Sequence, residues 1–314
     1  MGGVMEKHAA DEFGQGAAGE EHDPAIESLS TGEEEDAIER AGPRPQVVYA
    51  SISARGLEEL RRPAISLFGS GVAAGLILMM SVVAEGLLSQ HLPAFGGREL
   101  VADIGYTFGF LLVILGRLQL FTENTITPVL PLLAKPSRRT LWRTGRLWAV
   151  VFAANMVGTM LAAVLLAWGG IVTDPQMAAI VDVSMKVTEH TPFETLRYGV
   201  IAGCLIAALV WVIPSARGGE FFLVFFVTYV IALGDFTHVI AGAGEGFVLL
   251  LEGDVGPGFV LFGLIVPAFV GNVLGGTVLF ATLAYVQVME EISQDKRHDR
   301  RPTVEQAPPP QLGT

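Results

Sequence analysis

One histidine of this chain lies deep inside an apolar part of the sequence, where an ionisable side chain is costly. His238 is the only one of the six histidines with such surroundings, and its imidazole can gain or lose a proton near neutral pH. Thr122 follows another apolar stretch, and its hydroxyl can donate or accept a hydrogen bond. If the two positions approach each other, the Thr122 hydroxyl could hydrogen-bond His238 and set which ring nitrogen faces the pathway. The structural alternatives are a core histidine bonded to a carbonyl group and a threonine that caps a helix.

Bulky apolar and acidic side chains flank these two positions. Leu120, Phe121 and Ile231 could form narrow constrictions on either side of the histidine, or they could be ordinary core or lipid-facing residues. Glu123 and Asp235 lie beside the same two positions, and as ionised groups they would repel an anion unless they are protonated or paired. The predicted substrate pathway consists of His238, Thr122, Leu120, Phe121, Glu123, Asn124, Phe236, Thr237, Ile231 and Asp235.

The composition indicates a membrane protein with acidic tails. Hydrophobic residues make up 51% of the chain and charged residues 17%, and the mean hydropathy is +0.50. The net charge is −12, but residues 1–48 alone hold twelve acidic residues against three basic ones. Such a tract cannot bury enough apolar surface to fold. We therefore predict disordered cytoplasmic tails at 1–48 and 293–314 and a transmembrane domain at 49–292.

Runs of apolar residues locate the membrane-spanning helices. Four runs reach about 20 residues, the length that crosses a bilayer: 65–84, 147–173, 198–216 and 255–289. Two more, 104–116 and 221–234, are half as long, stop at polar residues and then resume. We predict an all-α protein with six transmembrane helices, of which the second and fifth are broken. Unwound backbone is tolerated at this depth only inside protein or beside a cavity, so the breaks mark the conducting site.

The two halves of this domain carry matching motifs in the same order. Three segments pair: Gly71-Val-Ala-Ala-Gly75 with Gly199-Val-Ile-Ala-Gly203, Leu115-Gly116 followed by Phe121-Thr122 with Leu233-Gly234 followed by Phe236-Thr237, and Phe152-x-x-Asn155-x-x-Gly158 with Phe269-x-x-Asn272-x-x-Gly275. This pattern predicts a duplicated unit of three helices. Because an odd number of spans reverses the direction of entry, the two units form an inverted repeat.

Basic residues indicate the orientation of the chain. They concentrate before the first span, between the second and third spans, and after the sixth, whereas the alternate connections are poor in Lys and Arg. Both termini are therefore predicted to be cytoplasmic, in the plasma (inner) membrane. Residues 49–62 are predicted to form a short amphipathic helix along the inner membrane surface.

Taken together, these residues resemble the formate/nitrite transporter family over about residues 50 to 292. The resemblance rests on Leu120-Phe121-Thr122 after a half-span, Phe236-Thr237-His238 in the fifth span, the Asn-x-x-Gly pair and the inverted layout. It implies an aquaporin-like fold assembled as a homopentamer, with a pore in each protomer. It also implies passage of small monovalent anions such as formate or nitrite, with His238 exchanging a proton with the solute and Thr122 as its hydroxyl partner.

The chain also departs from that family. Glu123 replaces a residue that is usually small, and Gly203 stands where a pore-facing Asn is common. Arg117 is the base that could pair with the acids near the breaks, and Lys186 is an approximate counterpart of the lysine that draws anions into the outer vestibule.

Two other functions remain as alternatives. One is a channel for neutral small solutes, against which the absence of Asn-Pro-Ala motifs at both breaks argues. The other is a non-conducting membrane protein for interaction or sensing, which Glu123 and Gly203 leave open. An enzyme is not expected, since no arrangement of nucleophile and base, phosphate-binding loop or metal-ligand spacing is present. No cofactor, metal or nucleic-acid partner is predicted, the last because no basic stripe could neutralise phosphates.

Overall fold

The computed structural model describes residues 30, 32, 33, 37 and 42–299, the last six without side chains. The chain divides into two units, 1–43 and 44–314. In the first unit, the backbone N–H and the hydroxyl of Ser30 both donate to the Glu33 carboxylate, at 2.9 and 2.7 Å. Most of the two predicted disordered tails lies outside the described residues. The parts that are described include the beginning of helix α3 (Pro45–Glu59) and the end of helix α15 (Thr282–Asp299).

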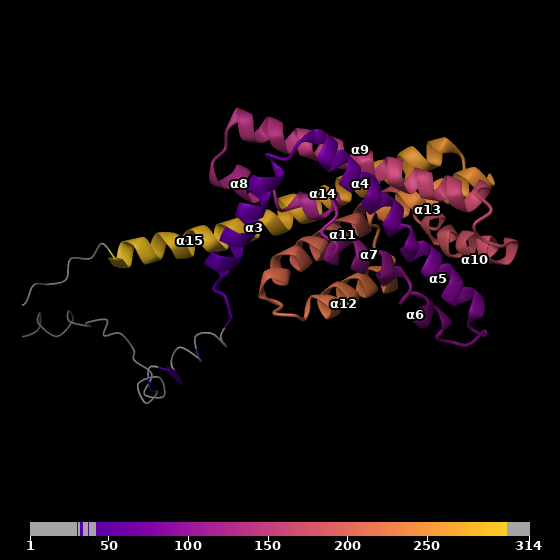
Figure 1. Ribbon diagram of the computed structural model, residues 1–314, viewed down its shortest axis with the longest axis horizontal. Coiled ribbons are helices and arrows are strands. Elements are labelled where there is room, and N and C mark those ends of the chain that lie inside the picture. Colours follow the sequence, from indigo (N-terminus) through magenta and orange to yellow (C-terminus); the bar gives the residue numbers. More distant parts are fainter. Residues whose placement is uncertain (1–29, 31, 34–36, 38–41, 300–314) are drawn as a thin grey trace, which may run out of the picture. The chain divides into compact units, whose positions relative to one another are not determined.

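The described part of the second unit is helical and contains no β-strand (Figure 1). Four long apolar segments could cross a membrane: Ala64–His91, Arg138–Trp168, Pro192–Ser215 and Phe259–Ser293. Their helices are α4 (Ala64–Leu78), α5 (Met80–His91), α9 (Arg138–Trp168), α11 (Pro192–Val212), η3 (Ile213–Ser215), the π-helices η4 (Phe259–Ile265) and η5 (Leu274–Ala281), α14 (Val266–Val273) and α15. They coincide with the four predicted continuous spans.

Capping residues extend two of these helices beyond the uncharged runs. Helix α9 begins at Arg138 because the Ser137 hydroxyl accepts a hydrogen bond from the backbone N–H of Thr140 at 3.1 Å. Helix α11 begins after Thr191, whose backbone N–H donates to the Glu194 carboxylate at 2.9 Å. Counting uncharged residues therefore finds the apolar centre of each span but misses its polar ends.

The second and fifth spans are broken, as predicted. The second consists of α7 (Tyr106–Leu115), an irregular loop with the 3₁₀ turn η1 (Glu123–Thr125), and α8 (Val129–Ala134). The fifth consists of α12 (Glu220–Leu233) and α13 (Val239–Glu252). Two residues after the ends of α7 and α12, Arg117 and Asp235 adopt left-handed φ values of 53° and 47°. Non-glycine residues rarely adopt this conformation, so both breaks are built in the same strained way.

Two buried asparagines hold the broken spans in place. Asn155 on α9 accepts a hydrogen bond from the Phe121 N–H and donates to the carbonyl of Gln119, both at 2.9 Å. Asn272 on α14 does the same with the Val239 N–H and the Thr237 carbonyl, also at 2.9 Å. Each asparagine also donates to the first span of its own half, at the carbonyls of Gly71 and Gly199 respectively.

These contacts confirm the repeat and correct one of its pairings. They superimpose residues 119–121 on residues 237–239, so the predicted match of Phe121-Thr122 with Phe236-Thr237 is wrong by three residues. The counterpart of His238 is therefore Leu120, and the counterpart of Thr122 is Ile240. The two halves place an apolar side chain and an imidazole at equivalent points.

Glycines allow the helices of each half to touch. A Cβ on Gly75 would lie 2.9 Å from the backbone nitrogen of Thr159, and one on Gly203 would lie 2.7 Å from the Cα of Asn272. Gly203 thus faces the backbone of α14. A pore-facing Asn is common at this position in the family that the sequence resembles, and in this chain Gly203 lies against α14.

Replacing Gly203 with alanine is expected to destabilise the fold by about 1–3 kcal/mol, because a backbone atom cannot move aside as a flexible side chain would. Gly75→Ala should cost about as much, since it meets the equivalent atoms of α9. Gly69→Ala is the matched control, because nothing lies within 4 Å of its added Cβ. Thermal unfolding of the three variants in detergent measures the effect. Equal stability of Gly69→Ala and Gly203→Ala would contradict this account.

At one end of the second unit, α3 packs against α8 and α15 (Figure 1). It begins at Pro45, a favoured first helical residue. Its residues Val48, Tyr49 and Ile52 are buried, and Gly56 lies against the Thr127 carbonyl. The helix predicted at residues 49–62 is thus present, but it runs from Pro45 to Glu59, and one of its faces packs against the bundle. At the other end lie α5, α6 (Arg98–Ala102), α10 (Asp174–Ser184) and the turn η2 (Met185–Thr188).

Candidate transport site

The two broken spans meet at His238 and Thr122. The Nε2 atom of His238 lies 2.7 Å from the Thr122 hydroxyl, although the residues are 116 positions apart. Both side chains are buried, and the ring of Phe110 packs edge-on against the imidazole at 4.9 Å between centroids. The structure thus brings together the two side chains that the sequence indicated.

The hydrogen bonds around His238 assign its neutral tautomer. As the N-cap of α13, its Nδ1 accepts a hydrogen bond from the backbone N–H of Ala241 at 3.3 Å. The neutral ring therefore carries its hydrogen on Nε2 and donates it to the Thr122 oxygen. Because the Thr122 oxygen accepts this bond, its own hydroxyl hydrogen is left to donate to a different acceptor. A solute oxygen next to this pair would meet an O–H donor that the imidazole orients.

A cavity lined by charged and apolar side chains leads to His238 from the end where α5 and η2 lie. About 60 Å³ of it is wide enough for the centre of a water molecule, which is room for a few waters or one small solute. Of the predicted pathway residues, five line this cavity: Ile231, Asp235, Phe236, Thr237 and His238.

The apolar residues of the first break lie deeper. Leu120 and Phe121 are fully buried and do not line the cavity. Three rings surround Phe121, those of Trp148, Phe152 and Phe269, at 5.9, 5.1 and 5.1 Å between centroids. Leu120, the structural counterpart of His238, belongs to the loop that Asn155 holds. Leu120 and Phe121 are therefore buried apolar side chains that precede Thr122 in this loop.

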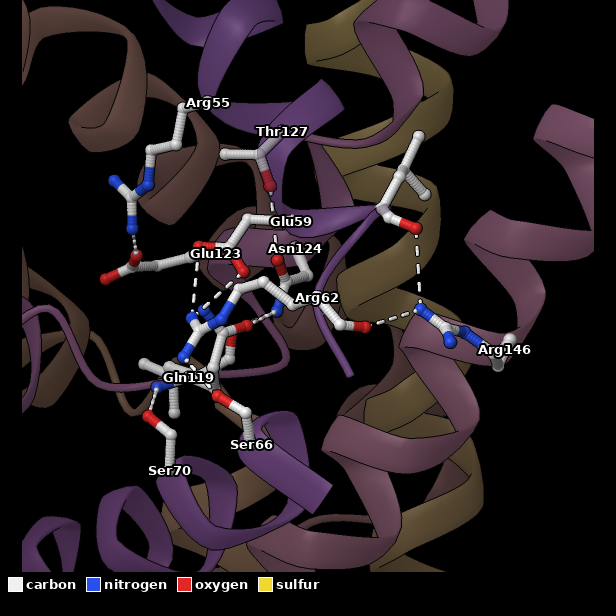
Figure 2. A network of polar contacts seen from close by, with 12 residues as sticks. Arg55, Glu59, Arg62, Ser66, Ser70, Gln119, Glu123, Asn124, Thr127 and Arg146 are labelled. Carbon is white, nitrogen blue, oxygen red and sulfur yellow. Dashed lines mark hydrogen bonds and ion pairs between the residues drawn. The ribbon is translucent and has the colours of Figure 1, made fainter. Parts of the chain in front are cut away.

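Glu123 and Asn124 belong to a polar network that faces α3 (Figure 2). The Glu123 carboxylate pairs with Arg55 of α3 at 2.9 Å and keeps its other oxygen buried without a hydrogen bond within the described residues. Asn124 donates to the Gln119 side chain at 3.1 Å and accepts from Thr127 at 3.2 Å. Both residues stabilise the loop of the second span.

This network corrects the expected partner of Glu123. Arg55, which precedes it by 68 residues, pairs with the carboxylate in place of Arg117. Arg117 and Asp235 are exposed at the two helix breaks. Of the two acids Glu123 and Asp235, Asp235 lines the cavity.

Replacing Arg55 with methionine is expected to cost about 2–3 kcal/mol, because it leaves a buried carboxylate without its partner. The cost is below that of a fully buried pair since the Arg55 side chain is 39% exposed. Adding Glu123→Gln should restore most of the loss, and unfolding of the single and double variants measures the coupling. Additive losses would exclude a stabilising ion pair.

The sequence does not reveal the role of several site residues. Asn155 and Asn272 stand out in it only as markers of the repeat, and their position one helical turn before a glycine is the one signal of a structural role. Glu85 and Glu245 line the cavity with Lys186, but each lies inside an otherwise apolar helix and belongs to no motif. An acidic residue within a span is by itself a signal that could have found them.

Lys186 is held by two carboxylates of the cavity wall. Its ammonium group lies 3.2 Å from Glu85 and 3.2 Å from Asp103. Burial by itself would lower the pKa of Lys186, but the two carboxylates raise it above its ordinary value. Burial raises the pKa of Asp103, against the opposing effect of Lys186. Lys186 therefore stays charged through the physiological range, and its charge is balanced locally.

Two broken helices that meet at a buried polar pair, inside a bundle of apolar spans, define a multi-pass membrane transport protein. The profile of the family described as "Formate/nitrite transporter" matches residues 46–286. The chain thus belongs to the formate/nitrite transporter family, whose members are channels and transporters, not enzymes.

Curated relatives cover most of the chain. It is 35% identical to the "Inner membrane protein YfdC" of Escherichia coli K12, over 86% of this chain and 87% of that protein. It is 27% identical to the "Formate-nitrite transporter" of Plasmodium malariae, over 75% and 79% of the two chains.

Solved structures confirm the fold. An "FNT family ion channel" matches with a TM-score of 0.66 and 19% identity, over 76% of this chain and 98% of that one. A "Pentameric formate channel with formate bound" matches with a TM-score of 0.60 and 19% identity, over 72% and 98%. The prediction of an aquaporin-like all-α fold is thereby confirmed.

Proposed function

We propose that this protein carries small monovalent weak-acid anions, such as formate or nitrite, and that His238 exchanges a proton with the solute. The observation that carries this proposal is the buried Thr122–His238 hydrogen bond at the meeting point of two broken spans, next to a cavity that His238 lines. The names of the related formate channel and formate-nitrite transporter support the substrate class.

The chemistry of the site favours passage as the neutral acid. A bare carboxylate pays several kcal/mol to enter an apolar layer, whereas the neutral acid pays much less. Leu120 and Phe121, which are fully buried beside Thr122 in the loop of the second span, would form such a layer. A proton supplied at His238 would let the solute cross that layer without charge, and the Thr122 hydroxyl would hold one of its oxygens.

We further propose a homopentamer in the plasma (inner) membrane, with a pore in each protomer and both termini in the cytoplasm. The pentameric formate channel supports the assembly, the inner-membrane relative supports the location, and the distribution of basic residues supports the orientation. In this arrangement 49–292 forms the transport domain, and 1–48 and 293–314 are cytoplasmic tails.

The other two functions have less support. A non-conducting sensor was suggested by Glu123 and Gly203, but the structure gives both a packing role, in the ion pair with Arg55 and against α14. A neutral solute exchanges no proton, so a neutral-solute channel would not explain why an imidazole is buried at a cost in free energy.

Uptake of labelled formate and nitrite into proteoliposomes, between about pH 5 and 8, tests the proposal. We expect uptake above that of protein-free liposomes, increasing as the pH falls. Absence of uptake of either anion at every pH would contradict the proposed function. Native mass spectrometry of the purified protein tests the pentamer separately.

A further inference from the structure

An apolar groove opens on the surface of the bundle between α9 and the sixth span. Gly145, Ala149 and Phe152 belong to its wall on α9, and Leu261 and Phe269 belong to its wall on η4 and α14. About 440 Å³ of the groove is wide enough for the centre of a water molecule, a volume within the range of ligand pockets. The groove therefore has room for an apolar ligand.

The groove crosses the level at which the two halves of the repeat meet. Phe152 and Phe269 occupy matching positions of the repeated motif, and their ring centroids are 5.0 Å apart. In an inverted repeat, the axis that relates the halves lies in the plane of the membrane, near its centre. The groove thus lies in the hydrocarbon region, where acyl chains of lipids are the molecules available to fill it.

The face of α9 that forms the groove continues to one membrane surface. Arg138 precedes Gly145 by two helical turns on this face, and Trp142 lies between them with 68% of its surface exposed. Exposed tryptophans are typical of the headgroup level of a bilayer. From Phe152 to Arg138 the helix rises about 21 Å, which is about half of the 40–45 Å that a bilayer spans with its headgroups. Arg138 therefore lies at the level of the lipid phosphates.

Charge distinguishes the two ends of the groove. At the start of α9, Arg138 and Arg139 are exposed, and their side chains make no hydrogen bond or ion pair with any residue that the structure describes. The helix N-terminus adds positive potential at the same point. At the opposite membrane surface, residues 252–258 precede η4 and contain Glu252 and Asp254 but no basic residue. Only the α9 end therefore favours an anionic headgroup.

We propose that this groove binds a phospholipid with an anionic headgroup, from the leaflet that borders the start of α9. Arg138 and Arg139 bind the phosphate, and one acyl chain passes Gly145 and Ala149 into the groove. Nothing lies within 4 Å of a Cβ added to Gly145, so the path of the chain is open. In the proposed orientation, this is the cytoplasmic leaflet.

The bound acyl chain contacts the aromatic side chains that surround Phe121. Trp148, Phe152 and Phe269 line the groove, and the same three rings lie 5.9, 5.1 and 5.1 Å from the ring of Phe121 between centroids. The lipid is thus separated by one layer of rings from the loop that carries Thr122. Its binding is expected to stabilise this loop.

Quenching of tryptophan fluorescence by brominated phospholipids tests the site. The chain has four tryptophans, and replacing Trp142, Trp168 and Trp211 with phenylalanine leaves Trp148 as the reporter in the groove. In phosphatidylcholine vesicles at low ionic strength, brominated phosphatidylglycerol should reach half of its maximal quenching at about thirtyfold lower mole fraction than brominated phosphatidylcholine. This factor follows because each basic residue near an anionic group contributes about fivefold.

A first pair of variants tests the headgroup contacts. In the same single-tryptophan background, Arg138→Gln/Arg139→Gln should make the two brominated lipids equally effective. Arg44→Gln/Arg61→Gln is the matched control, because it removes two exposed basic residues that do not belong to α9. It should keep the preference for phosphatidylglycerol.

A second pair of variants tests the path of the acyl chain. Gly145→Phe should fill the groove and abolish quenching at low mole fractions of phosphatidylglycerol. Gly69→Phe is its control, since nothing lies within 4 Å of a Cβ at that position either and it does not line the groove. Phosphatidylglycerol should also raise the unfolding temperature of the detergent-solubilised parent, and it should not do so for Gly145→Phe.

Two results would overturn the inference. Equal quenching of the parent by both lipids would show that the arginines do not select the headgroup. Absence of quenching by either lipid in an assembled protein would show that a second copy of the chain, and not a lipid, covers the groove. None of these measurements requires transport, so they separate this inference from the proposed function.

Discussion

Substituting asparagine for His238 is expected to lower formate uptake by about a hundredfold at neutral pH, the lower end of what a positioned proton donor or acceptor contributes. Asparagine keeps one structural feature of the histidine, because its side-chain oxygen can still cap α13 at the N–H of Ala241. Its shorter side chain does not reach the Thr122 hydroxyl as Nε2 does, and a Thr122→Val variant measures the effect of losing that bond. Asparagine cannot exchange a proton, so the loss beyond that of Thr122→Val measures proton exchange.

Two controls separate the chemistry from the packing. Thr122→Val removes the hydroxyl that the imidazole orients but leaves the imidazole, so its uptake should fall less than that of His238→Asn. Leu120→Met changes the counterpart of His238 in the other half of the repeat without changing polarity, and it should transport almost as the parent does. All three variants should unfold at nearly the parent temperature. Parent-level uptake by His238→Asn would show that protons are exchanged elsewhere.

Replacing Asn272 with leucine is expected to destabilise the protein by about 3–5 kcal/mol, because three buried backbone groups lose their partners at once and each costs about 1–3 kcal/mol. These groups are the N–H of Val239 and the carbonyls of Thr237 and Gly199, all bonded at 2.9 Å. Asn272 is fully buried and leucine fills its place, so bulk water does not reach these groups. Because the first two groups flank His238, uptake should be lost together with stability.

Thermal unfolding in detergent, followed by tryptophan fluorescence, measures this loss. Asn155→Leu should lose as much stability, since it releases the equivalent groups around Leu120. Thr228→Val is the control for a buried polar group: its hydroxyl bonds only to carbonyls of its own helix, which keep their helical bonds. If Asn272→Leu unfolds at the same temperature as Thr228→Val, the asparagine does not hold the break.

Local properties of the sequence determined the architecture. Hydropathy over about 20 residues is a local quantity, and a polar interruption of an apolar run is visible without knowing what it contacts. The six spans, the two breaks and the importance of His238 and Thr122 could therefore be predicted. The repeat could be predicted as well, because its Gly and Asn markers recur in the same order.

Contacts between distant segments decided the rest. Arg55 pairs with Glu123 across 68 positions, and Lys186 pairs with Glu85 across 101. Neither pairing leaves a periodic or local signal, since each depends on how separate helices pack. For the same reason only the packed bundle showed that Gly203 faces the backbone of α14 and that Leu120 is the counterpart of His238. The sequence by itself located the charged and polar residues of the spans; their partners, and hence the electrostatic character of the cavity, were set by tertiary structure.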